Sequence, residues 1–334
     1  MTTLLVGTRG SALATAQAGG VARALADAIG GEAELLTVTT HGDTSRASLS
    51  TLGGTGVFAA ALRDALLDGA CDLVVHSMKD LPTAALPGLV IGAVPAREDA
   101  RDALCARDGL TLDELPHGAR VGTGSPRRIA QLKHRRPDLD VVDIRGNVGT
   151  RLGFVTSGEL DAVVLAAAGL ARLGLSEAAT EFFDIETWPT APAQGVLAVE
   201  VRSTDLETLA ADAPLVRALT AVTDAAAEAA ATAERAVLSR LEAGCAAPVA
   251  AHAVLSGGEL TVDAHVYALD GTAVRARQQR VTIGDVWAPA SGPDAGPAVH
   301  DTGALMKRAA RAGTELADAL LAAGAADLAP LRES

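Results

Sequence analysis

Three short apolar runs end in turns of small residues that carry arginine, and a helix-like segment follows each turn. The runs are LLVGT before Arg9-Gly10-Ser11, ARVGT before residues 124–128, and DVVDI before Arg145-Gly146-Asn147. Such strand–turn–helix units predict open α/β sheets, whose ligands bind at the carboxyl ends of the strands beside helix N-termini. The sequence therefore predicts a ligand site at these turns.

Two arginines stand at the start of one predicted helix. Ser125 is a suitable N-cap and Pro126 a suitable first helical residue, which places Arg127 and Arg128 in the first turn. Cations are unfavourable there because the helix dipole is positive at its N-terminus. A ligand with several carboxylates or phosphates would supply a reason for both arginines. We therefore expect a site for a polyanion.

Basic residues are concentrated between 117 and 151, where arginine and lysine outnumber aspartate although the whole chain has a net charge of −13. At Lys133, Arg135 and Arg136, a solvated helix face explains the charge. The turn contexts instead favour ligand binding by four arginines: Arg127, Arg128, Arg145 and Arg151.

The composition limits the possible functions. A chain of 334 residues with 49% hydrophobic and 21% charged residues is typical of a globular protein of two or three domains. Its acidity and its 2% aromatic content disfavour nucleic-acid binding. No apolar run is long enough for a membrane span, and the N-terminus lacks the features of a signal peptide. We expect a cytoplasmic protein without membrane or nucleic-acid partners.

The alternation of strands and helices predicts two α/β lobes. Residues 1–97 and 196–213 would form the first lobe, since the strand VLAVEVR can return to it, and residues 98–195 would form the second. Two chain crossings would make the lobes a hinged pair with the ligand between them, as in periplasmic binding proteins.

A smaller C-terminal α+β domain is expected over residues 214–334. Its predicted parts are one long helix over 216–242, three antiparallel strands and a final helix over 303–323. Residues 284–302 are rich in proline, glycine and aspartate and are typical of a surface loop.

A lysine and an aspartate are adjacent where the predicted strand DLVVHSM ends. Lys79 would bind an anionic arm of a substrate, and Asp80 would handle protons or stabilise a positive charge. A surface ion pair without function is the alternative for this pair.

The three cysteines are too few and too scattered for a disulfide framework or a zinc site. Cys71 and Cys105 lie beside or within apolar runs and are expected to be buried. Cys245 lies in a turn bounded by Gly244 and Pro248, where its sulfur would face a cleft or simply play a structural part.

The motifs together resemble a known family, hydroxymethylbilane synthase, also called porphobilinogen deaminase. The resemblance extends over roughly residues 4–256. It rests on TRGS at 8–11, HSMKDLP at 76–82, VGTGSPRR at 121–128, RGNVGTR at 145–151, LAAAGLARLGL at 165–175, QG at 194–195 and TAERAVLSRLEAGCAAPVA at 232–250.

The resemblance implies a monomeric transferase of porphyrin, tetrapyrrole and heme biosynthesis. Such enzymes join four porphobilinogen molecules head to tail with loss of ammonia, and hydrolysis then releases hydroxymethylbilane to the next pathway enzyme. The implied cofactor is dipyrromethane, attached by a thioether to Cys245, and no metal is implied. Asp80 matches the catalytic aspartate, whose carboxylate would stabilise the cationic azafulvene formed as ammonia leaves.

The resemblance also assigns binding residues by position. Cofactor binding falls to Cys245, Ser77, Lys79, Thr123, Ser125, Arg127, Arg128, Arg145 and Gly146. Substrate binding falls to Arg9, Ser11, Gln17, Phe58, Arg145, Arg151, Arg172 and Gln194. The chain departs from the family pattern at Thr55, where lysine is frequent, at His41, where arginine or lysine is frequent, and at Gly124, where a hydroxyl residue is usual.

Two alternatives remain open at this point. A non-enzymatic two-lobe module would bind carboxylates with the same arginines, and a different enzyme would act on another polyanion without a covalent cofactor. An inert Cys245 would favour either alternative.

Overall fold

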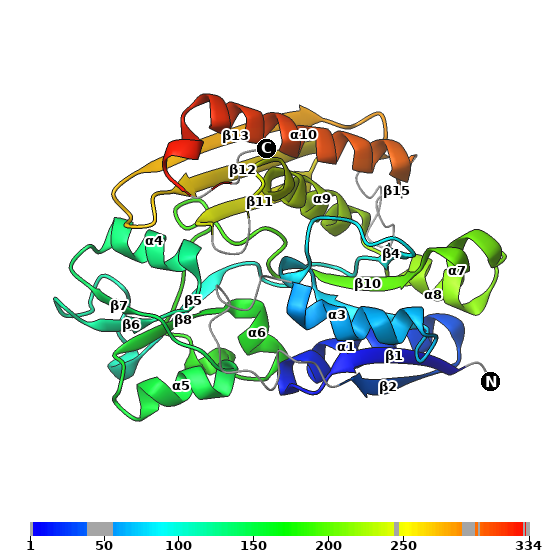
Figure 1. The fold of residues 1–334 in the computed structure, drawn as a ribbon, viewed down its shortest axis with the longest axis horizontal. Helices are drawn as coiled ribbons and strands as arrows, with labels where there is room; N and C mark the ends of the chain where they lie inside the picture. The colour runs from blue at the N-terminus through cyan, green and yellow to red at the C-terminus, as the bar shows by residue number, and fades with distance from the viewer. Residues whose placement is uncertain are drawn as a thin grey trace. The chain divides into compact units, whose positions relative to one another are not determined.

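The computed structural model describes residues 3–38, 56–243, 247–288, 298–299, 301–329 and 331. The chain forms two compact units, whose elements are labelled in Figure 1. The first unit contains residues 1–98, 171–174 and 195–224, and the second contains residues 99–170, 175–194 and 225–334.

The first unit is built on a five-stranded sheet in the order β2-β1-β3-β10-β4. Its strands are β1 (Thr3–Arg9), β2 (Glu32–Val38), β3 (Leu73–Ser77), β4 (Leu89–Ala93) and β10 (Leu197–Arg202). Strand β1 is parallel to β2 and β3, whereas β10 is antiparallel to both of its neighbours, β3 and β4. The predicted return of VLAVEVR to the first sheet is confirmed.

Helices cover both faces of this sheet. They are α1 (Ala12–Ile29), α3 (Gly56–Leu67), α7 (Ser203–Thr208) and α8 (Pro214–Val222). Because side chains alternate along a strand, Leu73 and Val75 of β3 pack in the cluster that contains α1 and α8. Val74 packs in the cluster of Leu62 and Leu66 from α3.

The second unit contains a sheet of the same layout, in the order β7-β6-β8-β5-β9. Its strands are β5 (Asp102–Ala106), β6 (Arg120–Gly122), β7 (Asp140–Val142), β8 (Ala162–Ala166) and β9 (Glu181–Phe182). Again the fourth strand in the order, β5, is antiparallel to its neighbours. In each sheet this reversed strand follows a passage of the chain from one unit to the other.

Helices α4 (Pro126–Arg135), α5 (Val148–Thr156) and α6 (Ala167–Arg172) accompany the second sheet. Strand β8 ends at Ala166, where the chain turns directly into α6. The α/β class with two sheet-containing lobes is therefore present, as predicted from the alternation.

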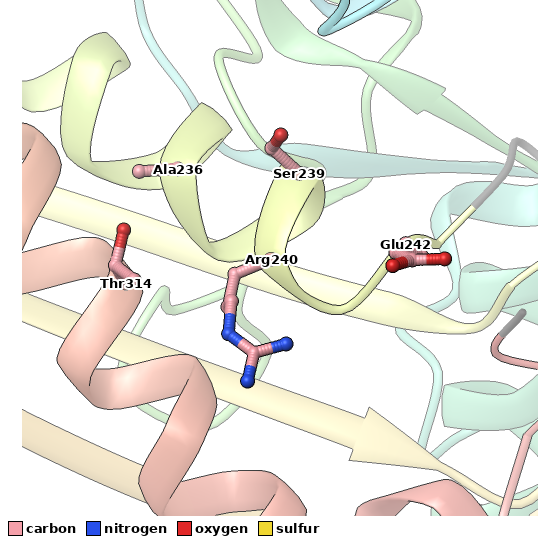
Figure 2. A pocket seen from close by; sticks show the side chains of 5 residues that line it. All are labelled: Ala236, Ser239, Arg240, Glu242 and Thr314. Carbon is pink, nitrogen blue, oxygen red and sulfur yellow. The ribbon is translucent and has the colours of Figure 1, made fainter. Parts of the chain in front are cut away.

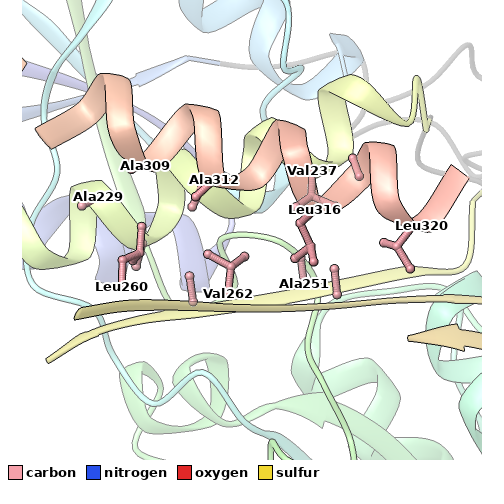
Figure 3. Packing of buried hydrophobic residues seen from close by; sticks show 14 of the residues in the cluster. Ala229, Val237, Ala251, Leu260, Val262, Ala309, Ala312, Leu316 and Leu320 are labelled. Atoms are coloured by element: carbon pink, nitrogen blue, oxygen red, sulfur yellow. The ribbon is translucent and has the colours of Figure 1, made fainter. Parts of the chain in front are cut away.

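The C-terminal part of the second unit is a three-stranded antiparallel sheet under two helices. Its elements are α9 (Ala225–Arg240), β11 (Val249–Ser256), β12 (Glu259–Tyr267), β13 (Val274–Thr282) and α10 (Thr302–Ala322). Figure 3 shows buried side chains such as Val237, Leu316 and Leu260 between the helices and the sheet. Alanines let α9 and α10 approach closely, and an added Cβ at Gly313 would overlap the backbone of Ala233.

The prediction of one long helix over residues 216–242 is wrong. The helix breaks at Thr223 and Asp224, and α8 and α9 belong to different units. The Thr223 hydroxyl donates to the Leu219 carbonyl (2.8 Å), and the Asp224 N–H donates to the carbonyl of Val94 (2.8 Å). Side chain and tertiary hydrogen bonds thus replace the helical ones at the break.

Residues 284–302 are more than a surface loop. Strand β14 (Trp287–Ala288) pairs with β15 (Ala298–Val299), and Trp287 is buried in the C-terminal core. Residues 289–297 and 300 lie outside the described residues. None of the described helices is long and apolar enough to cross a membrane.

Candidate functional site

The first unit presents several predicted site residues where β1 and β3 end. Arg9 is the last residue of β1, and the Ser11 side chain accepts a hydrogen bond from the Ala14 N–H (3.3 Å), which caps α1. Gln17 is buried on α1. Since β1 and β3 are parallel neighbours, their carboxyl ends lie at the same edge of the sheet.

Strand β3 ends in a single 3-10 turn, η1 (Met78–Asp80). Met78 is buried, and its N–H donates to the Val196 carbonyl (3.0 Å), which fixes the turn to the strand segment beside it. Lys79 is half-buried, and Asp80 is exposed. The turn therefore holds a cation and a solvent-accessible carboxylate at the edge that carries Arg9.

The second unit presents the equivalent edge at β6 and β7. The Ser125 hydroxyl caps α4 by accepting from the Arg128 N–H (3.5 Å), with Pro126 as the first helical residue, so the predicted helix start is confirmed. Asn147 caps α5 by accepting from the Thr150 N–H (2.9 Å). The first turns of α1, α4 and α5 contain no acidic residue.

The turns after β6 and β7 approach each other closely. An added Cβ at Gly124 would lie 2.6 Å from the Ile144 carbonyl oxygen. Thr123 is fully buried, and its hydroxyl accepts from the Ser125 N–H (3.3 Å). The glycine that departs from the family pattern thus stands where a side chain would displace the neighbouring turn.

Arg145 and Arg151 lie in and after the turn that follows β7, and each has a partner there. The Arg151 Nε donates to the Gly146 carbonyl (2.9 Å), and Gly146 has a positive φ of 109°. The Arg145 guanidinium lies 3.8 Å from the Asp143 carboxylate. This arrangement keeps both cations at the carboxyl end of β7.

Arg172, at the end of α6, is grouped with the first unit. Its guanidinium donates to the Gly195 carbonyl (3.0 Å). Burial lowers the pKa of Arg172, and the nearby charge of Glu98 opposes that effect. The side chain stays a cation at neutral pH, because an arginine pKa lies far above 7.

Arg127 and Arg128 are buried and share one carboxylate that the sequence analysis missed. Asp102, the first residue of β5, is fully buried; Oδ2 accepts from Arg127 (2.7 Å) and Oδ1 from Arg128 (2.6 Å). Burial disfavours the charged carboxylate, yet the two guanidinium groups hold the pKa of Asp102 well below its usual range. These arginines therefore have a partner inside the protein, and their position does not by itself require an external anion.

The sequence offers little signal for this partner. Asp102 stands 25 residues before Arg127 and 26 before Arg128, at the start of the apolar run DALCA. An acidic residue leading into a buried strand is the only local sign. Its pairing with α4 follows from the way α4 packs on the sheet.

A further pocket lies in the C-terminal part of the second unit. It has a volume of about 310 Å³ between α9 and α10 and is lined by Ala236, Ser239, Arg240, Glu242 and Thr314 (Figure 2). Arg240 is paired with Asp318 on α10 (2.7 Å). The pocket contains none of the predicted site residues.

Several predicted positions lie outside the described residues. These are Cys245, His41 and Thr55, and the side chain of Phe58 at the start of α3 is likewise not described. Within the described part of the chain, no group of three or more histidine, cysteine, aspartate or glutamate side chains suits a metal ion. Cys71 and Cys105 are buried free thiols, as expected.

Each unit is an α/β structure built on a five-stranded sheet, with arginines in or after the turns at the carboxyl ends of its strands. Comparison with known families narrows this class. The family model described as porphobilinogen deaminase, dipyromethane cofactor binding domain, matches residues 4–210, and the porphobilinogen deaminase C-terminal domain matches residues 229–292. The chain belongs to the porphobilinogen deaminase family.

Relatives match almost end to end. The porphobilinogen deaminase of Leifsonia xyli is 60% identical over 98% of this chain and 95% of its own length. That of Micrococcus luteus is 50% identical over 99% of this chain and 95% of its own length. A solved periplasmic substrate-binding protein from Coxiella burnetii has 14% identity and a TM-score of 0.43, covering 66% of this chain and 91% of that protein.

Proposed function

We propose that this chain is a transferase that joins four porphobilinogen molecules head to tail, releases ammonia at each addition, and frees hydroxymethylbilane by hydrolysis. The observation that carries this function is the match to one enzyme family over both parts of the chain. A non-enzymatic carboxylate-binding module is not favoured, because the relatives that match end to end are named as deaminases.

The cofactor of this family is dipyrromethane, two linked pyrroles whose acetate and propionate arms make it a polyanion. The second unit fits such a group. The formal charges of Arg127, Arg128 and Asp102 sum to one net positive charge in a buried place. The Nε atoms of both arginines are buried and have no hydrogen-bond partner among the described residues. Buried guanidinium donors of this kind favour a carboxylate partner.

When bound, the cofactor supplies the pyrrole carbon to which the first substrate molecule is added. We propose that it is held in the second unit by Thr123, Ser125, Arg127, Arg128, Arg145 and Gly146 and in the first by Ser77 and Lys79. The caps at Ser125 and Asn147 present helix N-termini without acidic first turns, which favour bound carboxylates.

Cys245 is the proposed attachment point, on the strength of its motif. The other two thiols are poor candidates for thioether formation. Burial raises the pKa of Cys71 and raises that of Cys105 to about 11, so neither forms the thiolate nucleophile readily.

Asp80 is the proposed catalytic residue. The carbon–nitrogen bond of the porphobilinogen aminomethyl group, in its protonated ammonium form, breaks; ammonia leaves with the bonding electrons, and the positive charge passes to the pyrrole. The exposed carboxylate of Asp80 at the end of β3 would accept a hydrogen bond from the pyrrole N–H and stabilise that charge. Substrate arms would be bound by Arg9, Ser11, Gln17, Phe58, Arg145, Arg151, Arg172 and Gln194.

We further propose that the protein is a cytoplasmic monomer that passes its product to the next tetrapyrrole-pathway enzyme. Its proposed domains are residues 1–97 with 196–213, residues 98–195, and residues 214–334. The family match at residues 4–210 and 229–292 supports a separate C-terminal part.

The intact mass of purified protein tests the proposal. We expect an added mass of two linked pyrroles, mapped by peptide analysis to Cys245 and absent from Cys245→Ala. Cys105→Ala is the matched control and should keep the added mass, because that thiol is buried. A bare polypeptide that porphobilinogen cannot load would contradict the proposed function.

A further inference from the structure

The buried carboxylate of Asp102 is saturated with hydrogen bonds from four different side chains. Oδ1 accepts from Arg128 (2.6 Å) and from the Gln194 amide (2.8 Å). Oδ2 accepts from Arg127 (2.7 Å) and from the Trp188 indole N–H (2.9 Å). A carboxylate has about four acceptor sites, so every site of Asp102 is used.

Both arginine side chains also donate hydrogen bonds to groups other than Asp102. Arg127 also donates to the Gln131 side chain (2.7 Å), and Arg128 donates to the Val164 carbonyl of β8 (2.9 Å). The guanidinium groups are therefore tied to the sheet as well as to helix α4. Only a few orientations of each long side chain satisfy all these contacts at once.

Two residues of the Asp102 cluster are close in sequence to points where the chain passes from one unit to the other. Asp102 stands four residues after Glu98, the last residue of the first unit's opening segment, and Gln194 is the last residue before the chain returns to the first unit at Gly195. The Gln194 amide also donates to the Ala100 carbonyl (2.8 Å). The arginine pair is thus anchored to two segments of the second unit that adjoin crossings to the first, one before β5 and one at Gln194.

We infer that Asp102 is a positioning residue, which orients the Arg127–Arg128 pair so that its remaining donors meet carboxylates of the cofactor; this inference rests on the proposed function. Asp102 uses one terminal nitrogen of each arginine and leaves each buried Nε without a partner among the described residues. One carboxylate between two guanidinium groups also leaves a positive charge for a bound anion. Asp102 itself does not touch the ligand.

Asp102→Asn tests this role, because asparagine keeps the shape but turns an amide N–H₂ toward donors. Protein made in cells that lack porphobilinogen is incubated with porphobilinogen, and the rate of cofactor attachment is followed by intact mass. We expect attachment to be at least about tenfold slower than in the wild type, which is the effect of one lost charge-assisted contact. The half-saturating porphobilinogen concentration for attachment should rise as well.

Glu200→Gln is the matched control. Glu200 is also a buried carboxylate, on the reversed strand of the other sheet, and it pairs with Arg63 (2.7 Å) rather than with a proposed cofactor residue. Thermal unfolding of both variants allows attachment to be compared at equal folded fraction. A general loss of stability would slow both variants alike and would overturn the inference, whereas a slow Asp102→Asn beside a normal Glu200→Gln would support it.

A second variant keeps the test decisive if Asp102→Asn fails to fold. Trp188→Phe removes one donor to Asp102 while keeping a ring stacked on Phe183. We expect attachment to slow by roughly threefold; an unchanged rate would overturn the inference. Wild-type protein that gains no cofactor mass would overturn the proposed function itself, whereas normal loading of both the wild type and Asp102→Asn would overturn the inference alone.

Discussion

Two buried carboxylates with different partners occupy the reversed strands of the two sheets. Asp102 of β5 binds the arginine pair of α4, and Glu200 of β10 binds Arg63 of α3 and lies 3.1 Å from His76. Asp80 differs from both, because it is exposed and lies in a turn at a strand end. At the scale of single residues, burial therefore separates carboxylates that hold the protein together from one that is accessible to a substrate.

Asp80→Asn should remove the accessible charge and leave the fold intact. We expect turnover of porphobilinogen to fall by roughly 10²- to 10⁴-fold, since the amide cannot stabilise a positive charge as a carboxylate does. Ammonia release measured against protein concentration is the readout, with circular dichroism as the control for folding. Near-normal turnover would remove Asp80 from the mechanism.

At the scale of elements, the turn between β7 and α5 depends on one glycine. Gly146 has φ of 109°, and an added Cβ would lie 2.7 Å from a side-chain carbon of Thr150. Its carbonyl also accepts the hydrogen bond that orients Arg151. A side chain at this position would strain the backbone and press on the helix that carries the arginine.

Gly146→Ala should therefore destabilise the protein by about 1–3 kcal/mol and weaken binding of porphobilinogen, seen as a higher KM. Gly158→Ala, at the other end of α5, is the matched control: its φ of 76° is also positive, but an added Cβ meets no atom within 4 Å. Thermal unfolding should show a lower midpoint temperature for both variants, and the KM for porphobilinogen should rise only for Gly146→Ala. An equal KM in the two would argue against a role for this turn in binding.

At the scale of the whole molecule, one buried carboxylate, Glu200, makes the stability of the first unit depend on acid. Burial alone would raise the pKa of Glu200, but hydrogen bonds and charges of His76 and Arg63 outweigh it and lower the pKa to about 2. Because the folded pKa is depressed, ionised Glu200 stabilises the first unit above about pH 4. That stabilisation, roughly 3 kcal/mol, is lost as the pH falls toward about 2.

Acid titration can separate the units, because both tryptophans, Trp188 and Trp287, lie in the second. We expect hydrogen-exchange protection of β10 and α3 peptides, corrected for intrinsic exchange, to fall between about pH 4 and pH 2. In Glu200→Gln this protection should be weaker than in the wild type at pH 7 and should change less as the pH falls. The pH midpoint of the tryptophan fluorescence transition should be the same as in the wild type. A variant with the wild-type pH profile would show that Glu200 is not the sensor.

The strand–turn–helix alternation was sufficient to predict both sheets, the return of β10 and the cap at Ser125. The strands, helices and cap depend on residues that are near one another in the chain, so local pattern and propensity specify them. The return of β10 is a long-range pairing with β3 and β4, and it was inferred from the strand's place in the alternation. The domain boundaries and the roles of individual site residues stay predictions. The helix break at Thr223 was missed because an acceptor on Val94, far away in sequence, takes the place of a helical one.

The sequence by itself determined the fold class, the positions of the arginines at strand ends and, through its motifs, the family. Only the tertiary structure decided where those arginines point. Arg127 and Arg128 are buried on a carboxylate at Asp102, with Gln194 and Trp188 brought to the same two oxygens from far along the chain. A buried ion pair forms where folding brings charges together out of water, and no local pattern encodes which distant carboxylate that will be.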